Sequence, residues 1–214
     1  MSYDHVLLPS GVATTPAALD AFLTAQNGEP ATEPVAAMAA ELDRRNGELA
    51  EADEFLGAPA PDGAMGAALF VSSPYDAIGH VRALLFELAT PRGYAVYDPQ
   101  LAWLMDPAGS VPVAVSHGGA GDFPYLTREL AHLWVPELGA PGPYLIVESG
   151  DQVYIQTYRH EDGRYDVEYR DGSSERHYTV RVDDPSTVAD LIWSWTIGDR
   201  SHFEALDWQR LTFQ

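Results

Sequence analysis

The last third of the chain, residues 144–214, constrains the fold most, because it reads as successive strands followed by a helix and a last strand. Polar and apolar side chains alternate along two of these runs, as expected for strands with one buried face. Asp-Gly at 162–163 and 171–172 favours tight hairpins in which both turn residues take positive φ. The pattern predicts an antiparallel meander with strands at 144–148, 153–158, 164–170 and 177–182.

A helix and a final strand are predicted to follow the meander. Asp183 or Asp184 is placed to cap a helix that has Pro185 in its first turn. Apolar residues then recur at helical spacing, and residues 207–213 alternate as a last strand. A helix of this kind covers one face of an antiparallel sheet and leaves the other face polar. The helical residues expected to face the sheet are Val188, Leu191, Ile192 and Trp195.

The first half of the chain alternates predicted strands with predicted helices. Strands are expected at 4–8, 67–72 and 94–97, and helices open at Thr15-Pro16, Thr32-Glu33-Pro34 and Ser73-Pro74. Residues 109–121 are rich in Gly and Pro, although 111–115 could form a strand, and Asp122 is expected to cap a further amphipathic helix. The sequence therefore predicts an α+β protein. It comprises an N-terminal β-α-α-β-α-β half (1–108), a Gly/Pro linker (109–121) and a C-terminal antiparallel sheet with two helices (122–214).

Charge is the most unusual feature of the composition. The chain has 32 acidic and 12 basic residues, a formal net charge of −20, and every basic residue is arginine. This charge favours a protein partner with a basic surface, approached by electrostatic steering. The alternative interpretation is the coding bias of a GC-rich genome combined with solubility. Nucleic-acid binding is not expected, because no basic patch exists to contact phosphates.

The sequence predicts no membrane span, cofactor or metal. No run is long and apolar enough to cross a bilayer, and the first residues lack the pattern of a secretion signal, so a cytoplasmic location is expected. Cysteine is absent, and the seven histidines do not follow the spacing of a zinc protease. Phosphate-loop and dinucleotide fingerprints are also missing.

Ser116–Gly121 contains a His-Gly-Gly run of the kind that supplies oxyanion-hole amides in some hydrolases. That function also requires a nucleophile elbow, and no Gly-x-Ser-x-Gly occurs in the chain. A glycine linker is the better interpretation. Asp183-Asp184 is likewise better explained by helix capping than by acid–base chemistry. No catalytic residue is therefore predicted.

The outer face of the meander is the best candidate for function. If the apolar set of the alternating strands enters the core, tyrosines and charged residues share the opposite face, a composition that suits protein binding. An ordinary solvated sheet face, stabilised by cross-strand pairs, is the alternative. The predicted partner-binding residues are Tyr154, Gln156, Tyr158, Asp166, Glu168, His177 and Arg181, with Trp193 beside the apolar stripe of the last helix.

The last third also resembles bacterial polymorphic-toxin immunity proteins of the small α+β type. The resemblance rests on Val167–Gly172 with His177 after it, on Val188–Trp195 with Gly198-Asp199, and on Leu206-Asp207-Trp208. It implies a cytoplasmic, non-catalytic protein that neutralises a toxin by tight binding. An acidic surface would suit a basic nuclease toxin.

Three hypotheses follow from the sequence. The first is a non-catalytic acidic module that binds a partner protein and occludes or regulates it. The second is an enzyme or biosynthetic accessory protein with a small-molecule or peptide cleft between the two halves, formed by His80, Tyr97, His117 and Asp122. The third is a structural or regulatory domain that forms a homo-oligomer through the Trp193 side of the last helix.

Overall fold

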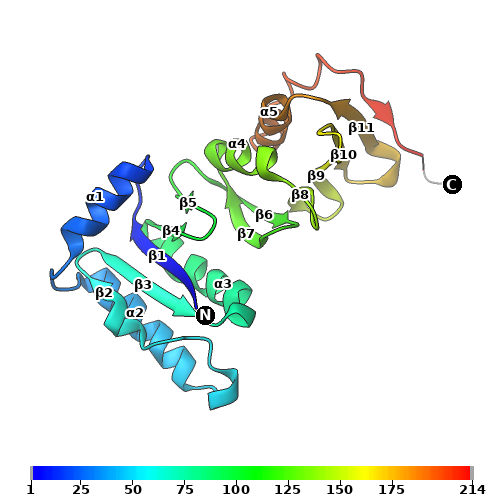
Figure 1. Cartoon of the computed structure of the whole chain (residues 1–214). Coiled ribbons are helices and arrows are strands. Elements are labelled where there is room, and N and C mark those ends of the chain that lie inside the picture. The colour runs from blue at the N-terminus through cyan, green and yellow to red at the C-terminus, as the bar shows by residue number, and fades with distance from the viewer. Residues whose placement is uncertain (1, 213–214) are drawn as a thin grey trace. The chain divides into compact units, whose positions relative to one another are not determined.

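The computed structural model describes residues 2–212, which form two compact units that divide between Ala108 and Gly109. Each unit combines helices with one antiparallel sheet, so the predicted α+β class is confirmed (Figure 1). Among the described residues, no helix has the length and apolar character needed to cross a membrane.

The N-terminal unit is built on a five-stranded sheet with strand order β2-β3-β1-β4-β5. Its strands are β1 (Tyr3–Pro9), β2 (Ala64–Met65), β3 (Ala68–Ser73), β4 (Tyr94–Asp98) and β5 (Trp103–Met105). Its helices are α1 (Pro16–Gln26), α2 (Glu33–Gly47) and α3 (Ile78–Ala89). Short 3-10 turns lie at η1 (Glu51–Asp53), η2 (Ala60–Gly63), η3 (Tyr75–Ala77) and η4 (Thr90–Arg92).

Helices cover both faces of this sheet. Leu8 and its neighbours on β4 pack against α1 through Leu19. The next residue of β1, Leu7, points to the opposite face, where α2 and α3 lie. The start of α1 matches the prediction, since the Thr15 side chain accepts a hydrogen bond from the Ala18 N–H.

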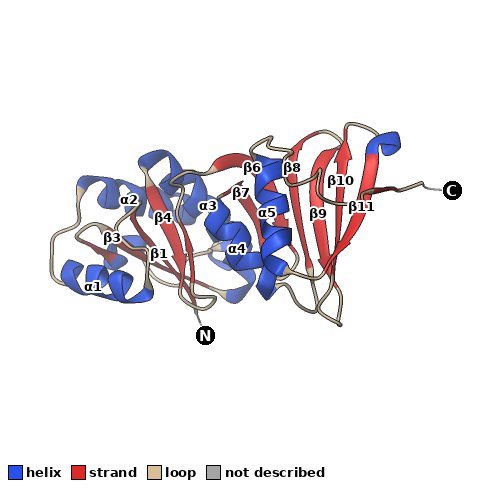
Figure 2. Cartoon of the chain, turned by 90° about the horizontal axis from the view of Figure 1, so that it is seen from above, coloured by secondary structure: helices blue, strands red, loops and turns tan. Residues whose placement is uncertain are grey.

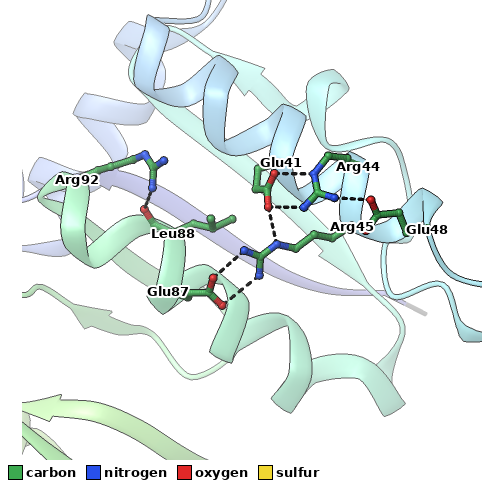
Figure 3. Close-up of polar contacts among 7 residues, drawn as sticks. All are labelled: Glu41, Arg44, Arg45, Glu48, Glu87, Leu88 and Arg92. Atoms are coloured by element: carbon green, nitrogen blue, oxygen red, sulfur yellow. Dashed lines mark hydrogen bonds and ion pairs between the residues drawn. The ribbon is translucent and has the colours of Figure 1, made fainter.

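The paired helices α2 and α3 are joined at their surface by an ion-pair network (Figure 3). The Arg45 guanidinium donates to both carboxylate oxygens of Glu87, at 2.7 and 3.1 Å, and to Glu41 at 2.7 Å. Arg44 binds Glu41 and Glu48 on the same helix. These arginines are therefore bound to acceptors of the chain itself.

The C-terminal unit is built on a seven-stranded sheet with strand order β12-β11-β10-β9-β8-β6-β7. Its strands are β6 (Val111–His117), β7 (Gly121–Leu126), β8 (Tyr144–Gly150), β9 (Val153–Arg159), β10 (Tyr165–Asp171), β11 (His177–Val182) and β12 (Gln209–Arg210). Its helices are α4 (Arg128–Glu137) and α5 (Pro185–Thr196), with a 3-10 turn at η5 (Ser174–Arg176). Strands β8 to β11 form the predicted meander.

The two Asp-Gly turns of the meander use glycine alone for the left-handed backbone. Gly163 and Gly172 have φ of 85° and 81°, whereas Asp162 and Asp171 are not among the residues with positive φ. The expectation that both Asp and Gly would take positive φ was therefore wrong. The side chain of Asp162 accepts a hydrogen bond from the Arg164 N–H at 3.1 Å instead, so the turn is stabilised by its carboxylate.

Four predicted elements or boundaries differ in the structure. Residues 109–121, expected as a linker, contain β6 and its turn to β7, because Val113 and Val115 supply a buried strand face. Asp122 does not cap a helix: it lies in β7, and α4 begins only after Thr127, whose side chain accepts from the Leu130 N–H.

The helix expected from Ser73-Pro74 starts later, at Ile78, after the 3-10 turn η3. The predicted last strand, 207–213, is reduced to Gln209–Arg210, and its end at Phe213 lies outside the described residues. The cap of α5 is as expected, since the Asp184 carboxylate accepts from the Thr187 N–H at 2.8 Å.

Candidate functional site

The two faces of the seven-stranded sheet differ sharply. One face is apolar and buried under α4 and α5, whose own buried residues include Leu130, Trp134 and Trp195 (Figure 2). A hydrogen bond from the Tyr165 hydroxyl to the Val135 carbonyl, 3.2 Å long, ties the sheet to α4. The buried residues of this face are Leu145, Val147, Ile155, Tyr165, Val167 and Val182.

The opposite face, here called the open face, is polar. In an antiparallel sheet, directly paired residues project to the same side, so the register fixes its members. Three rows of paired residues run across β8, β9, β10 and β11. They are Tyr144, Tyr158, Asp166 and Arg181; Ile146, Gln156, Glu168 and Thr179; and Glu148, Tyr154, Arg170 and His177. Strand β6 extends the last two rows with Ser116 and Ala114.

Seven of the eight residues predicted to bind a partner are brought together on the open face. They are Tyr154, Gln156, Tyr158, Asp166, Glu168, His177 and Arg181. Trp193 is not with them: it lies half-buried on α5, the helix of the apolar face. Its predicted part in partner binding stays a prediction, separate from the open face.

Sequence reasoning missed the part of the open face on β8 and one arginine on β10. Tyr144–Glu148 reads as an apolar run, so no outward set is apparent there. In the structure its odd and even residues separate: Leu145 and Val147 are buried, while Tyr144 and Glu148 are exposed. The signal that could have revealed this face is that Tyr144 and Glu148, at the two ends of the run, lie an even number of residues apart. Residues at even spacing project from the same side of a strand.

A hydrogen-bond chain crosses the centre of the open face. Glu168 Oε2 accepts from Gln156 Nε2 at 2.8 Å and lies 3.2 Å from His177 Nε2. The Arg170 guanidinium lies 3.1 Å from His177 Nδ1. Because arginine only donates, Nδ1 is the acceptor, and the imidazole proton sits on Nε2, facing the carboxylate. His177 therefore connects Arg170 to Glu168 as a neutral ring.

Burial keeps His177 neutral. Its ring is 3% exposed, and this burial lowers the pKa of His177, an effect that the Glu168 carboxylate opposes and Arg170 reinforces. The Arg170 guanidinium also lies over the Tyr154 ring, 5.4 Å from its centroid, and donates to Gln152 at 2.6 Å. These contacts hold this end of the face in one arrangement.

A second cluster centres on Asp166. Its carboxylate accepts from Arg181 Nε at 2.8 Å and lies 2.7 Å from His160 Nε2. The hydrogen bond from Arg181, followed by that from His160, lowers the pKa of Asp166 against the opposing effect of burial. Both Asp166 oxygens are thus bound, and the cluster is a salt-bridged surface rather than a pair of free carboxylates.

Among residues 2–212, the hollows of the open face include the following three. A hollow of about 640 Å³ lies between β6 and the β8–β9 turn and is lined by Ala114, Glu148, Asp151 and Tyr154, among others. A second, of about 400 Å³, lies between Tyr144 and Tyr158, and a third, of about 460 Å³, lies beside Arg181. The last two share Asp166 and Glu168. Shallow hollows of this kind give a docking surface relief without enclosing a small molecule.

Another polar cluster lies in the N-terminal unit, but it is sealed. Asp98 is fully buried and accepts from the Tyr3 hydroxyl at 2.6 Å and from Arg82 Nη2 at 2.9 Å. His5 lies beside it, with Nε2 3.9 Å from the carboxylate. Burial, followed by the charge of Arg82, lowers the pKa of His5 to about 4. The sealed cluster (Tyr3, His5, Arg82 and Asp98) is a core element, because helix α3 covers it.

The residues of the cleft hypothesis do not converge within either unit. His80 is exposed on α3, whereas Tyr97 faces α1 across the five-stranded sheet. In the other unit, Asp122 bonds Ser116 on the open face, while His117 points to the apolar face, 6.0 Å from the Trp134 ring centroid. No cluster of three or more potential metal ligands occurs among residues 2–212.

The comparisons with family models, curated proteins and solved structures gave no match. The α+β fold and the open face therefore carry the functional argument by themselves.

Proposed function

We propose that the protein is a non-catalytic binding module that docks a partner protein on the open face of its C-terminal sheet. The observation that carries this proposal is the asymmetry of the sheet: two helices cover its apolar face, while the opposite face presents Tyr144 and Tyr158 at 39% and 48% exposure. Exposed tyrosines among polar side chains are the composition of protein-binding surfaces.

A basic partner suits this face. The N-terminal unit has 15 acidic residues against four arginines, and the C-terminal unit has 17 against eight, so acidity alone does not select a surface. On the open face, however, both arginines are bound to groups of the chain: Arg181 to Asp166, and Arg170 to Gln152 and His177. Glu148 and Asp151 carry the charge at the hollow beside the β8–β9 turn. A cationic surface is steered to such a patch.

The resemblance to immunity proteins fits the same role. A partner seated on the open face would be covered over a broad, shallow area, which occludes a surface without chemistry. A toxin with a basic active-site region is the kind of partner implied, and binding would take place in the cytoplasm. The fixed hydrogen-bond chain through Glu168 and His177 supports docking, because a rigid face loses little entropy on association.

Affinity capture with matched variants tests the proposal. Ala114 is exposed on the open face, and Ala36 is exposed on α2 of the other unit, so Ala114→Arg and Ala36→Arg add the same charge at different places. The tagged wild type and the Ala36→Arg protein are expected to retain the same partner from the source cell. Ala114→Arg should retain at least about tenfold less of it, as expected for a charge and a bulky side chain set against a basic interface.

Equal capture by the wild type and both variants would contradict docking on the open face. Loss of the partner with Ala36→Arg alone would indicate that the interface lies on the N-terminal unit. Circular dichroism and melting temperature of each variant establish that lost binding does not reflect lost folding.

A further inference from the structure

The three tyrosines of the open face differ in what lies over their rings. Tyr154 is covered by the guanidinium of Arg170, 5.4 Å from the ring centroid. The Tyr144 and Tyr158 rings are more exposed, and no arginine of residues 2–212 lies over either of them. The His160 ring meets Tyr158 with a centroid distance of 5.2 Å, but Tyr158 stays 48% exposed. A cation from another molecule can therefore approach both tyrosines without displacing an arginine of the chain.

These two rings border the second hollow, about 400 Å³ in volume, together with Ile146. Tyr144 and Tyr158 are direct cross-strand partners, and Ile146 lies in the neighbouring row. One wall of the hollow is thus aromatic and aliphatic, and the other wall carries the carboxylates of Asp166 and Glu168. A side chain with an apolar stem and a cationic head matches both walls.

The two carboxylates differ in whether one oxygen is left without a hydrogen bond. Both oxygens of Asp166 are bound, by Arg181 and His160. Glu168 accepts from Gln156 and His177 through Oε2 alone. Within residues 2–212, its Oε1 accepts no hydrogen bond, and the side chain is 26% exposed. Glu168 Oε1 is therefore the atom that can receive a donor from outside.

We propose that the hollow between Tyr144 and Tyr158 receives an arginine side chain of the partner protein, an inference that rests on the docking function proposed above. A guanidinium is planar and weakly hydrated, so it stacks on an aromatic face while donating to a carboxylate at its edge. An ammonium is more strongly hydrated and lacks the planar surface.

The sheet itself already uses this geometry. Arg170 stacks on Tyr154 while donating to a side-chain oxygen, and Arg159 lies 5.8 Å from the Tyr165 centroid while donating to backbone carbonyls. The partner's arginine would repeat, between molecules, a contact that the chain makes within its own fold. The acidic surface of the whole chain adds a favourable long-range field.

A titration with Nα-acetyl-L-argininamide tests the inference on the intact protein without a partner. The ring signals of isotope-labelled tyrosine report each site by nuclear magnetic resonance. Saturable shifts are expected for Tyr144 and Tyr158 but not for Tyr75, an exposed tyrosine of the N-terminal unit. The neutral isostere Nα-acetyl-L-citrullinamide should produce neither saturation nor shifts of comparable size.

Matched variants separate the ring from the charge. Tyr158→Leu is expected to weaken argininamide binding about two- to fivefold, whereas Tyr158→Phe keeps the ring and should bind within about twofold of the wild type. Glu168→Gln removes the charge and should also weaken binding about two- to fivefold. Because Tyr158 is 48% exposed, its variants test the site even if Glu168→Gln disturbs the hydrogen-bond chain.

Equal shifts at Tyr75, or equal shifts with citrullinamide, would overturn the inference, because they indicate non-specific attraction or simple stacking. Unchanged binding in both Tyr158→Leu and Glu168→Gln would do the same. None of these results affects docking itself, which fails separately if Ala114→Arg captures the partner as well as the wild type does.

Discussion

Each unit of the chain contains a cluster of a tyrosine, a histidine, an arginine and a carboxylate, but the two clusters differ in whether helices cover them. Tyr3, His5, Arg82 and Asp98 form the sealed cluster of the N-terminal unit. Tyr154, His177, Arg170 and Glu168 form a comparable group, here called the open cluster, on the C-terminal sheet. The first group has helices over it, and the second faces outward.

The difference lies in the layers around each sheet. Helices cover both faces of the five-stranded sheet, so its polar groups are removed from water. Asp98 accepts from Tyr3, from Arg82 and from the N–H groups of Gln100 and Leu101. Within residues 2–212, neither ring nitrogen of His5 has a hydrogen-bond partner. The seven-stranded sheet is covered on one face only. Residue type alone therefore does not decide where a polar cluster lies; the number of layers decides whether it is sealed in the core or lies on an uncovered sheet face.

The largest expected effect breaks the sealed cluster. Asp98→Ala removes the carboxylate that neutralises the buried Arg82, and loss of one partner of a buried ion pair costs about 3–5 kcal/mol of unfolding free energy. Glu168→Ala on the open face should cost about 1 kcal/mol or less, because the side chain is partly solvated. Urea unfolding followed by amide signals of each unit measures both. Equal losses would remove the distinction between the clusters.

A pH titration of stability sharpens the comparison next. His5 is fully buried, and its pKa falls from 6.5 to about 4 on folding. The folded state then disfavours protonation, so this contribution is present above pH 6.5 and is lost as the pH falls towards 4. The loss amounts to about 3 kcal/mol at 1.36 kcal/mol for each unit of pKa shift.

The matched variant for this titration is His5→Leu, which removes the imidazole from the sealed cluster. As the pH falls from 6.5 towards 4, the wild type should lose unfolding free energy relative to the variant. A difference that does not depend on pH would show that burial does not lower the pKa of His5. The charged groups around the ring, Asp4, Arg82 and Asp98, are common to both proteins.

The helical cover of the C-terminal sheet gives a smaller effect. Thr127 caps α4 by accepting from the Leu130 N–H at 3.1 Å, so Thr127→Ala should destabilise this unit by about 1 kcal/mol. Thr127→Ser keeps the hydroxyl and serves as the control. The open face should still bind its partner, since the cap lies on the covered side. Thermal unfolding measures the loss, and equal loss in Thr127→Ser would contradict capping as its cause.

The smallest effect is expected at the surface of α2 and α3. Arg45→Gln breaks the contacts with Glu41 and Glu87 shown in Figure 3. Hydrogen bonds from Arg44 and then Arg45 lower the pKa of Glu41 to about 2, but the network is exposed and screened by salt. The melting temperature should fall slightly at low salt and converge with the wild type at high salt. A persistent difference at high salt would indicate packing rather than charge.

Much of the fold was readable from local pattern. Period-two alternation and Asp-Gly turns identified the meander, and caps such as Thr15 and Asp184 marked helix starts correctly. Because the period of two fixes which residues share a face, seven members of the open face followed from the sequence.

The remainder depended on contacts that no local pattern encodes. The Gly and Pro residues favoured a linker over the strand that 111–115 could form, although Val115 pairs β6 with both β7 and β8 in the sheet. Asp122 resembles a helix cap in the sequence, yet it lies in strand β7, where its carboxylate accepts a hydrogen bond from the Ser116 hydroxyl. The sealed cluster joins His5, Arg82 and Asp98 from distant parts of the chain, which single-residue signals cannot reveal.

The central claim, docking on the open face, is tested most directly by a tyrosine nitration footprint of the protein with its captured partner. Tyr144 and Tyr158 should be nitrated in the free protein and protected in the complex, while Tyr75 of the N-terminal unit should be nitrated in both. Mass spectrometry of the nitrated peptides reads out each site. Protection of Tyr75 with continued nitration of Tyr144 and Tyr158 would place the partner elsewhere and contradict the account.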